Sequence, residues 1–195
     1  QQDKLERLQN HEIYREGLQQ QAQSEHTKCL ELCTKINSIR SRYGKELTLL
    51  LKDALEDLNF INVSFEISIQ SKEDSISQDG YDDIEFMIST NPGEPMKSLG
   101  NVASGGELSR IMLALKTVFA DRDRIDTLIF DEIDTGISGK TAWKVSEKMA
   151  LLGKNHQVIC ITHLPQIASM ADNHYVIEKS VIENKTVTRI HELED

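Results

Sequence analysis

Apolar and polar positions divide the chain into a long helical segment and a segment of alternating strands and helices. Residues 3–58 contain no proline, and apolar side chains recur there at the 4-3 spacing of a coiled coil. The stripe consists of Leu18, Ala22, Cys29, Leu32, Ile36, Ile39, Tyr43 and Leu50, and is interrupted by Glu25 and Glu46. At about 1.5 Å per residue such a helix extends roughly 80 Å and needs a partner helix. We predict a coiled-coil arm over residues 1–60.

The remaining residues, 61–195, alternate between the two periods. Apolar positions at every second residue predict strands over residues 63–69 and 84–88, joined by a polar turn into an antiparallel hairpin. Further helices are predicted over residues 107–120, 140–152 and 166–170, and further strands over residues 127–130, 158–162, 174–178 and 186–191. This order predicts an α/β domain, with a mainly parallel sheet covered by helices.

Two adjacent glycines precede the helix predicted over residues 107–120. Gly105 and Gly106 allow the backbone to approach a ligand closely, and Ser104 places a hydroxyl beside them. The amide groups at a helix start attract phosphate, which the helix dipole also favours. The same residues are equally consistent with an N-cap serine followed by a turn.

Two carboxylates follow the strand predicted over residues 127–130. Ligand sites in open α/β sheets lie at the carboxyl ends of strands, so Asp131 could hold Mg²⁺ and Glu132 could orient an attacking water. Without a second motif, the pair would more simply be a solvated strand end or a helix cap. His163 ends the next buried strand of the same predicted sheet, where it could donate a hydrogen bond to a terminal phosphate.

These three motifs together resemble ABC-type ATPases of the SMC-like class. Residues 103–107 resemble the signature motif, and Asp131 with Glu132 resembles the Walker B pair. Residues 134–139 resemble the D-loop, and His163 resembles the switch histidine. The combined sequence is most similar to the RecN family of bacterial SMC-like DNA repair proteins.

The resemblance implies the C-terminal lobe of an ABC-type ATPase head that follows a descending coiled-coil helix. It implies that Asp131 holds Mg²⁺, through water, and that Glu132 and His163 act on the ATP of the same head. Ser104, Gly105 and Gly106, together with Glu107, would cover the ATP of an opposing head. Asp134 would lie at the contact between the two heads. Hydrolysis would separate the heads during repair of DNA double-strand breaks.

A phosphate loop of the form G-x-x-x-x-G-K-[ST] is missing from the sequence. Gly139, Lys140 and Thr141 supply its second half, but Asp134 stands where its first glycine is required. We therefore expect the chain to be inactive alone and to need its own N-terminal head lobe with the ascending coiled-coil strand. The expected assembly is a homodimer through ATP-sandwiched heads that binds DNA. A transporter ATPase subunit and an SMC-like structural protein without turnover remain alternatives.

The composition of the chain bears on its expected partners and cellular location. The net charge of −10 argues against a broad DNA-binding face, and the lysines at positions 140, 144, 148 and 154 are read as a solvated helix face. The three cysteines lack metal-ligand spacing and suit a reducing cytosol. The sequence contains neither a signal peptide nor a long apolar run. We expect a cytoplasmic, nucleoid-associated location and no membrane partner.

Overall fold

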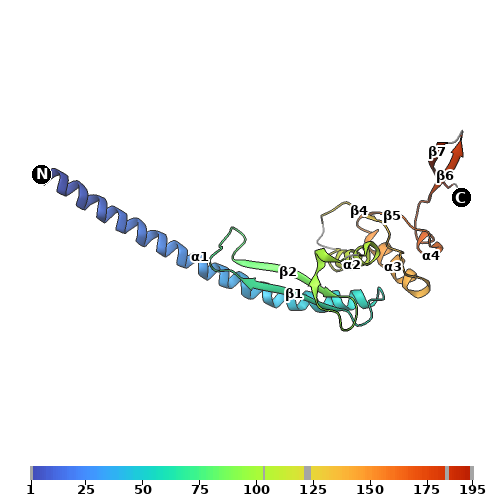
Figure 1. The fold of residues 1–195 in the computed structure, drawn as a ribbon, viewed down its shortest axis with the longest axis horizontal. Helices are drawn as coiled ribbons and strands as arrows, with labels where there is room; N and C mark the ends of the chain where they lie inside the picture. The colour runs from blue at the N-terminus through green and yellow to red at the C-terminus, as the bar shows by residue number, and fades with distance from the viewer. Residues whose placement is uncertain (1, 103, 121–123, 183–184, 194–195) are drawn as a thin grey trace. The chain divides into compact units, whose positions relative to one another are not determined.

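The computed structural model describes residues 2–102, 104–120, 124–182 and 185–193. In chain order the elements are α1 (Gln2–Glu56), β1 (Ser64–Ser71), β2 (Asp82–Ser89), β3 (Lys97–Ser98), the 3-10 helix η1 (Leu99–Asn101), α2 (Gly105–Val118), β4 (Thr127–Phe130), α3 (Gly139–Leu152), β5 (Gln157–Cys160), α4 (Pro165–Ala168), β6 (Tyr175–Ile182) and β7 (Lys185–Glu192) (Figure 1). The α/β class is confirmed. Residue 103 of the predicted signature motif lies outside the described residues.

The residues form two compact units that differ in their chain segments. One unit consists of Gln1–Thr48 with Glu66–Met87, and the other of Leu49–Phe65 with Ile88–Asp195. Helix α1 and the hairpin strands β1 and β2 contribute to both units. The division of the chain at residue 60 into an arm and a lobe stays a prediction.

Helix α1 is one uninterrupted helix of 55 residues, as the absence of proline predicts. Most of the apolar stripe of the sequence is open to solvent, since Leu32 is 57% exposed and Leu18, Ile39 and Tyr43 are also exposed, whereas Ile36 is half-buried. A different face of α1 is covered instead. Cys33, which stands one turn after the exposed Cys29, is buried. One face of the helix is therefore packed against other residues, whereas most of its apolar stripe is exposed to solvent.

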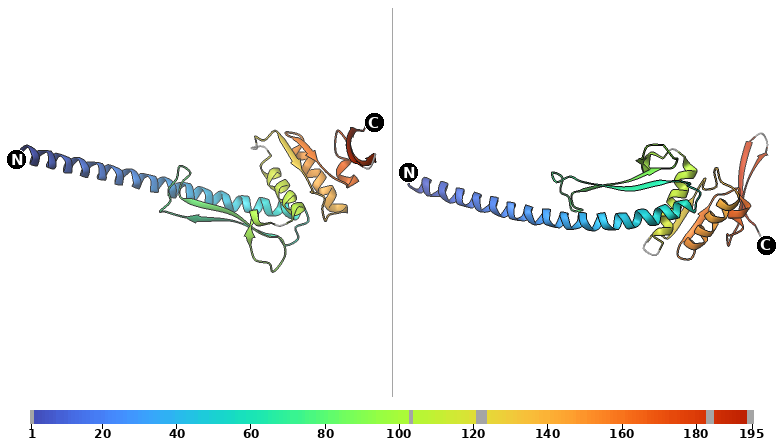
Figure 2. Two further views of the ribbon diagram at one scale, coloured as in Figure 1. Left: turned by 45° about the horizontal axis from the view of Figure 1, so that its top comes forward. Right: turned by 90° about the horizontal axis from the view of Figure 1, so that it is seen from below.

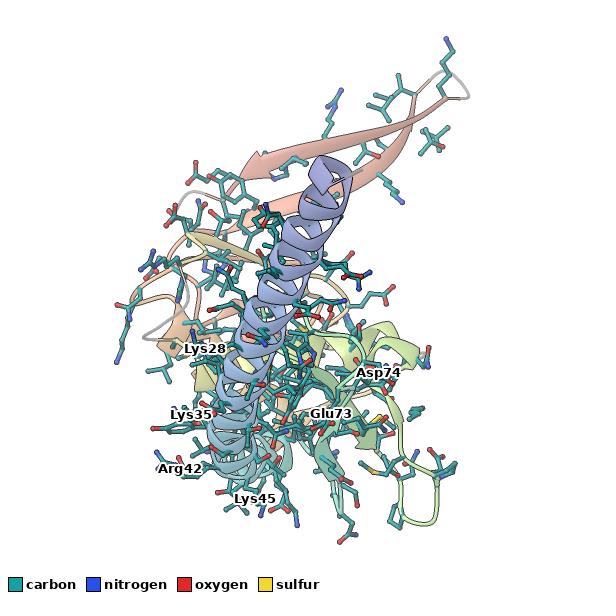
Figure 3. All side chains as sticks on the ribbon, turned by 90° about the vertical axis from the view of Figure 1, so that its left-hand side faces the viewer. Lys28, Lys35, Arg42, Lys45, Glu73 and Asp74 are labelled. Carbon is teal, nitrogen blue, oxygen red and sulfur yellow. The ribbon has the colours of Figure 1, made fainter. Side chains whose placement is uncertain are left out.

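Strands β1 and β2 run along α1 in the first unit, which Figure 2 shows from two sides. Asp82 of β2 forms polar contacts with α1. Its buried carboxylate accepts hydrogen bonds from Asn37 Nδ2 at 2.8 Å and from Arg40 Nη1 at 3.1 Å. The basic side chains Lys28, Lys35, Arg42 and Lys45 lie on the side of α1 away from the hairpin residues Glu73 and Asp74 (Figure 3). The hairpin, which the sequence predicts, thus packs on a helix face that includes Ile36 of the heptad stripe but is otherwise formed by residues outside it, such as Asn37 and Arg40.

The second unit contains the parallel strands and their helices. β4 pairs with β5 in parallel register, from Thr127 opposite Gln157 to Phe130 opposite Cys160. Helices α2 and α3 lie side by side in both views of Figure 2 and pack against each other. The largest fully buried apolar side chains of this unit are Leu51, Leu55, Leu58, Val63, Ile88, Ile111, Leu113, Ile133, Val145 and Leu152.

The strands of the second unit are less buried than their apolar sequences predict. Leu128 and Phe130 are buried, but Ile129 is 67% exposed and its register partner Ile159 is also exposed. The reason is that the sheet holds only β4 and β5 among the described residues. β6 and β7 pair antiparallel with each other rather than with β5. In the described part of the chain, no helix is long and apolar enough to cross a membrane.

Candidate functional site

Ser104 forms the N-cap of α2. Its backbone is extended, with φ −91° and ψ 121°, and its hydroxyl oxygen accepts a hydrogen bond from the amide of Glu107 at 3.3 Å. Glu107 adds a negative charge in the first turn, where the helix dipole favours it. The N-cap interpretation is therefore confirmed, and the Ser104 hydroxyl still has its own hydrogen to donate to a ligand.

The two glycines of this helix start lie against the loop that follows β4. A Cβ on Gly106 would lie 2.9 Å from the carbonyl oxygen of Glu132 and 2.9 Å from the Cβ of Thr135. A Cβ on Gly105 would collide with the Glu132 carboxylate. The glycines therefore permit close packing of two backbone segments, in addition to any approach by a ligand.

The loop after β4 presents both carboxylates of the candidate site to solvent. Asp131 Oδ1 accepts a hydrogen bond from the Glu132 amide at 2.9 Å, and both side chains are exposed. Glu132 has φ +56°, a left-handed conformation that is uncommon for a residue with a side chain. Such backbone strain persists only where surrounding contacts hold it.

Two side chains of α2 supply those contacts. Ser109 Oγ donates a hydrogen bond to the Asp131 carbonyl at 2.7 Å. Arg110 Nη1 donates to the carbonyls of Ile133 at 3.2 Å and Thr135 at 2.8 Å. The backbone of the carboxylate loop is thereby fixed from both sides of Glu132.

Arg110 is a buried cation. The residue is 8% exposed, and its guanidinium carbon lies 5.6 Å from the centre of the Phe60 ring. Burial lowers the pKa of Arg110, and the charge of Glu107 acts in the opposite direction. Since a buried charge is tolerated only with partners, the two carbonyl oxygens stabilise Arg110 while Arg110 orders the loop.

Asp134 joins the same loop to the end of β5. Its carboxylate Oδ2 accepts hydrogen bonds from the Thr162 hydroxyl and from the His163 amide, the latter at 2.8 Å. The ring nitrogen Nδ1 of His163 lies 3.0 Å from the same oxygen. Burial raises the pKa of Asp134, but the hydrogen bonds from Thr162 and His163 lower it by more, so the net pKa lies below the ordinary value.

Helix α3 begins at Gly139, so Lys140 and Thr141 lie in its first turn after β4 and the carboxylate loop. A phosphate loop also ends at the start of a helix that follows a strand, so the exclusion of this segment stays a prediction that rests on Asp134 in place of the first glycine. On the same helix, Lys144 pairs with Glu147 and Lys148 with Asp57, each at 2.9 Å. These two lysines are thus already neutralised locally.

The structure brings the predicted residues into one cluster within the second unit. The helix start at Ser104 to Glu107 packs on the loop carrying Asp131, Glu132 and Asp134, and that loop contacts His163. Sequence reasoning missed Ser109, Arg110 and Thr162 as supports. The only available signal was their place directly beside the motifs.

The donor set suits Mg²⁺ as a partial site. Within the described ranges, no group of three or more histidine, cysteine, aspartate or glutamate residues could hold a metal ion. Mg²⁺ bound to a nucleotide takes one or two protein carboxylates and completes its shell with phosphate and water. The exposed carboxylate of Asp131 can supply such a single protein ligand. The described residues do not form a metal site built from protein ligands alone.

Comparison with known proteins gives one consistent result. No family model matches the chain. The chain is 43% identical to the DNA repair protein RecN of Halalkalibacterium halodurans over 82% of its own length and 29% of that protein. It is 34% identical to the DNA repair protein RecN of Bacillus subtilis over 98% of its length and 36% of that protein. The chain thus spans about a third of these relatives.

A solved structure supports the fold. The Smc head domain with an extended coiled coil from Pyrococcus furiosus matches 84% of this chain and 38% of its own chain, with a TM-score of 0.55 and 18% identity. At this identity the match concerns the fold alone, a head domain with its coiled coil.

Replacement of Gly106 by alanine tests the close packing at the helix start. We expect Gly106→Ala to lower the free energy of unfolding by about 1–3 kcal/mol, because the added methyl meets backbone that must shift. Gly17→Ala is the matched control, since a Cβ there meets nothing within 4 Å and alanine favours a helix. Urea unfolding of both variants measures the difference. Equal stabilities for the two variants would contradict the packing argument.

The lowered pKa of Asp134 predicts a pH dependence of stability. Its ordinary value is 3.8, and the folded value lies below it, so its contribution is complete above the ordinary value and is lost as the pH falls through the folded pKa. Between about pH 5 and about pH 3, the free energy of unfolding should fall less steeply in Asp134→Asn than in the unmodified chain. Urea unfolding at several pH values checks this, and identical slopes would show that Asp134 is not stabilised as an ion.

Proposed function

Because the chain is a relative of the RecN DNA repair proteins, we propose that it forms part of an SMC-like ATPase acting in recombinational repair of DNA double-strand breaks. The observation that carries the proposal is the packing of the Ser104–Glu107 helix start on the loop with Asp131 and Glu132, to which His163 is also joined. Three segments distant in sequence thereby meet around exposed polar groups. Phosphoryl transfer requires such groups at fixed positions.

Three residues would act on the nucleotide of the same head. The exposed carboxylate of Asp131 would hold Mg²⁺, with water between them, and Mg²⁺ would neutralise developing charge on the phosphates. Glu132 would orient the attacking water from the turn in which its backbone has a positive φ. His163 would donate a hydrogen bond to the terminal phosphate.

The helix start would serve the nucleotide of an opposing head. The Ser104 hydroxyl and the amides of Gly105 and Gly106 would bind its phosphates, with Glu107 beside them. Two identical heads would then enclose two ATP molecules as a homodimer. Asp134 would lie at the contact between the heads; because it is buried, the exposed residues Thr135 and Gly136 that follow it would meet the opposing head beside it.

The phosphate loop would come from the protein's N-terminal lobe. Support comes from the open apolar surface of the parallel strands, where Ile129 and Ile159 are exposed. A shallow groove beside them is lined by Leu108, Ser109, Met112, Lys116, Leu128, Ile129 and Phe130. An apolar surface of this kind on a parallel sheet calls for a covering layer.

The arm would pair with an ascending helix of the same protein. The exposed heptad stripe of α1, including Leu18, Leu32 and Ile39, is the surface that such a helix would cover. The paired arm would transmit head opening and closing to DNA at the nucleoid. A transporter subunit fits less well, because a helix of 55 residues precedes the helix start here.

ATP turnover by the full-length protein tests this function. We expect Glu132→Gln to slow hydrolysis by about a hundredfold or more while ATP still drives the heads together, because binding groups remain and only water activation is lost. Turnover and dimer formation by light scattering, each with and without DNA, are the measurements. Glu147→Gln is the control, because its carboxylate pairs only with Lys144 on α3 in the described contacts.

Separate expression of the two halves tests the division of the site. Activity should arise only when this chain is mixed with the half that contains the phosphate loop. Turnover by this chain alone would overturn our exclusion of residues 139–141 as a phosphate loop. A full-length protein that hydrolyses no ATP would favour a structural role without turnover.

A further inference from the structure

Asp134 concentrates three donors on one carboxylate oxygen. The Thr162 hydroxyl, the His163 amide at 2.8 Å and the His163 ring nitrogen Nδ1 at 3.0 Å all meet Oδ2. The residue is 4% exposed, whereas the side chain of His163 is 76% exposed. One buried group thus holds a ring that otherwise projects into solvent.

The contact decides which ring nitrogen carries the hydrogen. An ionised carboxylate can only accept, so a hydrogen on Nδ1 is required for an attractive contact at this distance. In a neutral imidazole the other nitrogen, Nε2, then has no hydrogen, and in the charged form it has one. The orientation places Nδ1 on the loop side and leaves Nε2 as the free end of the ring.

We propose that Asp134 is a positioning residue that acts through His163, holding Nδ1–H toward the carboxylate so that Nε2 alone faces the nucleotide. This inference rests on the proposed function for its nucleotide, but the ring orientation belongs to the chain itself. When Nε2 also carries a hydrogen, it would donate that hydrogen to a phosphate oxygen, while Nδ1 stays on Asp134.

The arrangement also links His163 to Glu132. Glu132 and Asp134 share one turn, in which the Thr135 amide donates to the Glu132 carbonyl at 3.0 Å. On the other strand, the Ile161 amide donates to the Phe130 carbonyl at 3.0 Å, which extends the pairing of β4 and β5 to the edge of the site. The backbone segments that carry Glu132 and His163 are therefore joined both by the pairing of β4 with β5 and by Asp134.

A purely structural role for Asp134 makes a different prediction. The hydrogen bonds from Thr162 and from the His163 amide would tie the loop to β5 without any contribution from the ring. Asparagine has the same shape and keeps an oxygen that can accept both bonds. It lacks the charge that favours a hydrogen on Nδ1, so Asp134→Asn separates the two roles.

The first test is the state of the ring itself. In the 195-residue chain labelled with ¹⁵N-histidine, two-bond ¹H–¹⁵N spectra at alkaline pH report which nitrogen carries the hydrogen, and His163→Gln assigns the signal. We expect the hydrogen on Nδ1 in the unmodified chain and a shift of population toward Nε2 in Asp134→Asn. Thr162→Val, which leaves both Asp134 and the ring, should keep the hydrogen on Nδ1. An unchanged ring in Asp134→Asn would overturn the proposal.

The second test is a double-mutant cycle for ATP turnover by the full-length protein. Asp134→Asn should lower kcat about tenfold or more while KM changes by less than about threefold. In a His163→Gln background it should lower kcat no further, because Asp134 acts through that ring. Asp126→Asn, an exposed aspartate before β4, should keep wild-type turnover.

The outcomes separate this inference from the proposed function. Equal losses from Asp134→Asn in both backgrounds would show that Asp134 acts independently of His163, and would overturn the inference while the ATPase assignment stands. A full-length protein without any ATP turnover would refute the proposed function, and the ring measurement would still decide the orientation of His163.

Discussion

The candidate site depends on the hydrogen bonds that the buried guanidinium of Arg110 donates to the loop after β4. Its bonds to the carbonyls of Ile133 and Thr135 hold a turn in which Glu132 has an unfavourable backbone conformation. Helix α2 can approach that turn only because Gly106 has no side chain. A buried cation without hydrogen-bond partners would be strongly destabilising. Because the loop carbonyls pair with Arg110 of α2, the helix and the loop stabilise each other.

Asp134 extends this arrangement to the neighbouring strand. Its carboxylate reaches across from the loop after β4 to Thr162 and His163 after β5, which adds a side-chain link beyond the two paired strands. Parallel strands bring their carboxyl ends to one edge, but they do not fix the groups that follow. Those groups are fixed here by one buried arginine and one buried aspartate.

The sequence predicts the elements better than their environment. The bounds predicted for the strand over residues 127–130 agree with those of β4 at both ends, because a short apolar run flanked by charged residues leaves few alternatives. The exposure of Ile129 was not predicted, since an apolar sequence does not reveal which layers are present. The hydrogen bonds of Arg110 and Asp134 were also not predicted, since the partners of these two side chains are 23 to 29 residues away in the chain. Likewise, the heptad pattern of α1 gives no sign that Asn37 and Arg40 face a hairpin.

Exposure divides the residues of the site into two groups with different tasks. Asp131, Glu132 and His163 are exposed, whereas Gly106, Arg110 and Asp134 are buried. Polar groups that already have their positions need little reorganisation when a charged ligand arrives, and this preorganisation is the main source of electrostatic catalysis. The exposed side chains that would touch a nucleotide are thus held in place by the buried side chains of Arg110 and Asp134, which would not. Under the proposed function, assembly of the site is therefore a meeting of two prepared surfaces rather than the folding of a loop around its ligand.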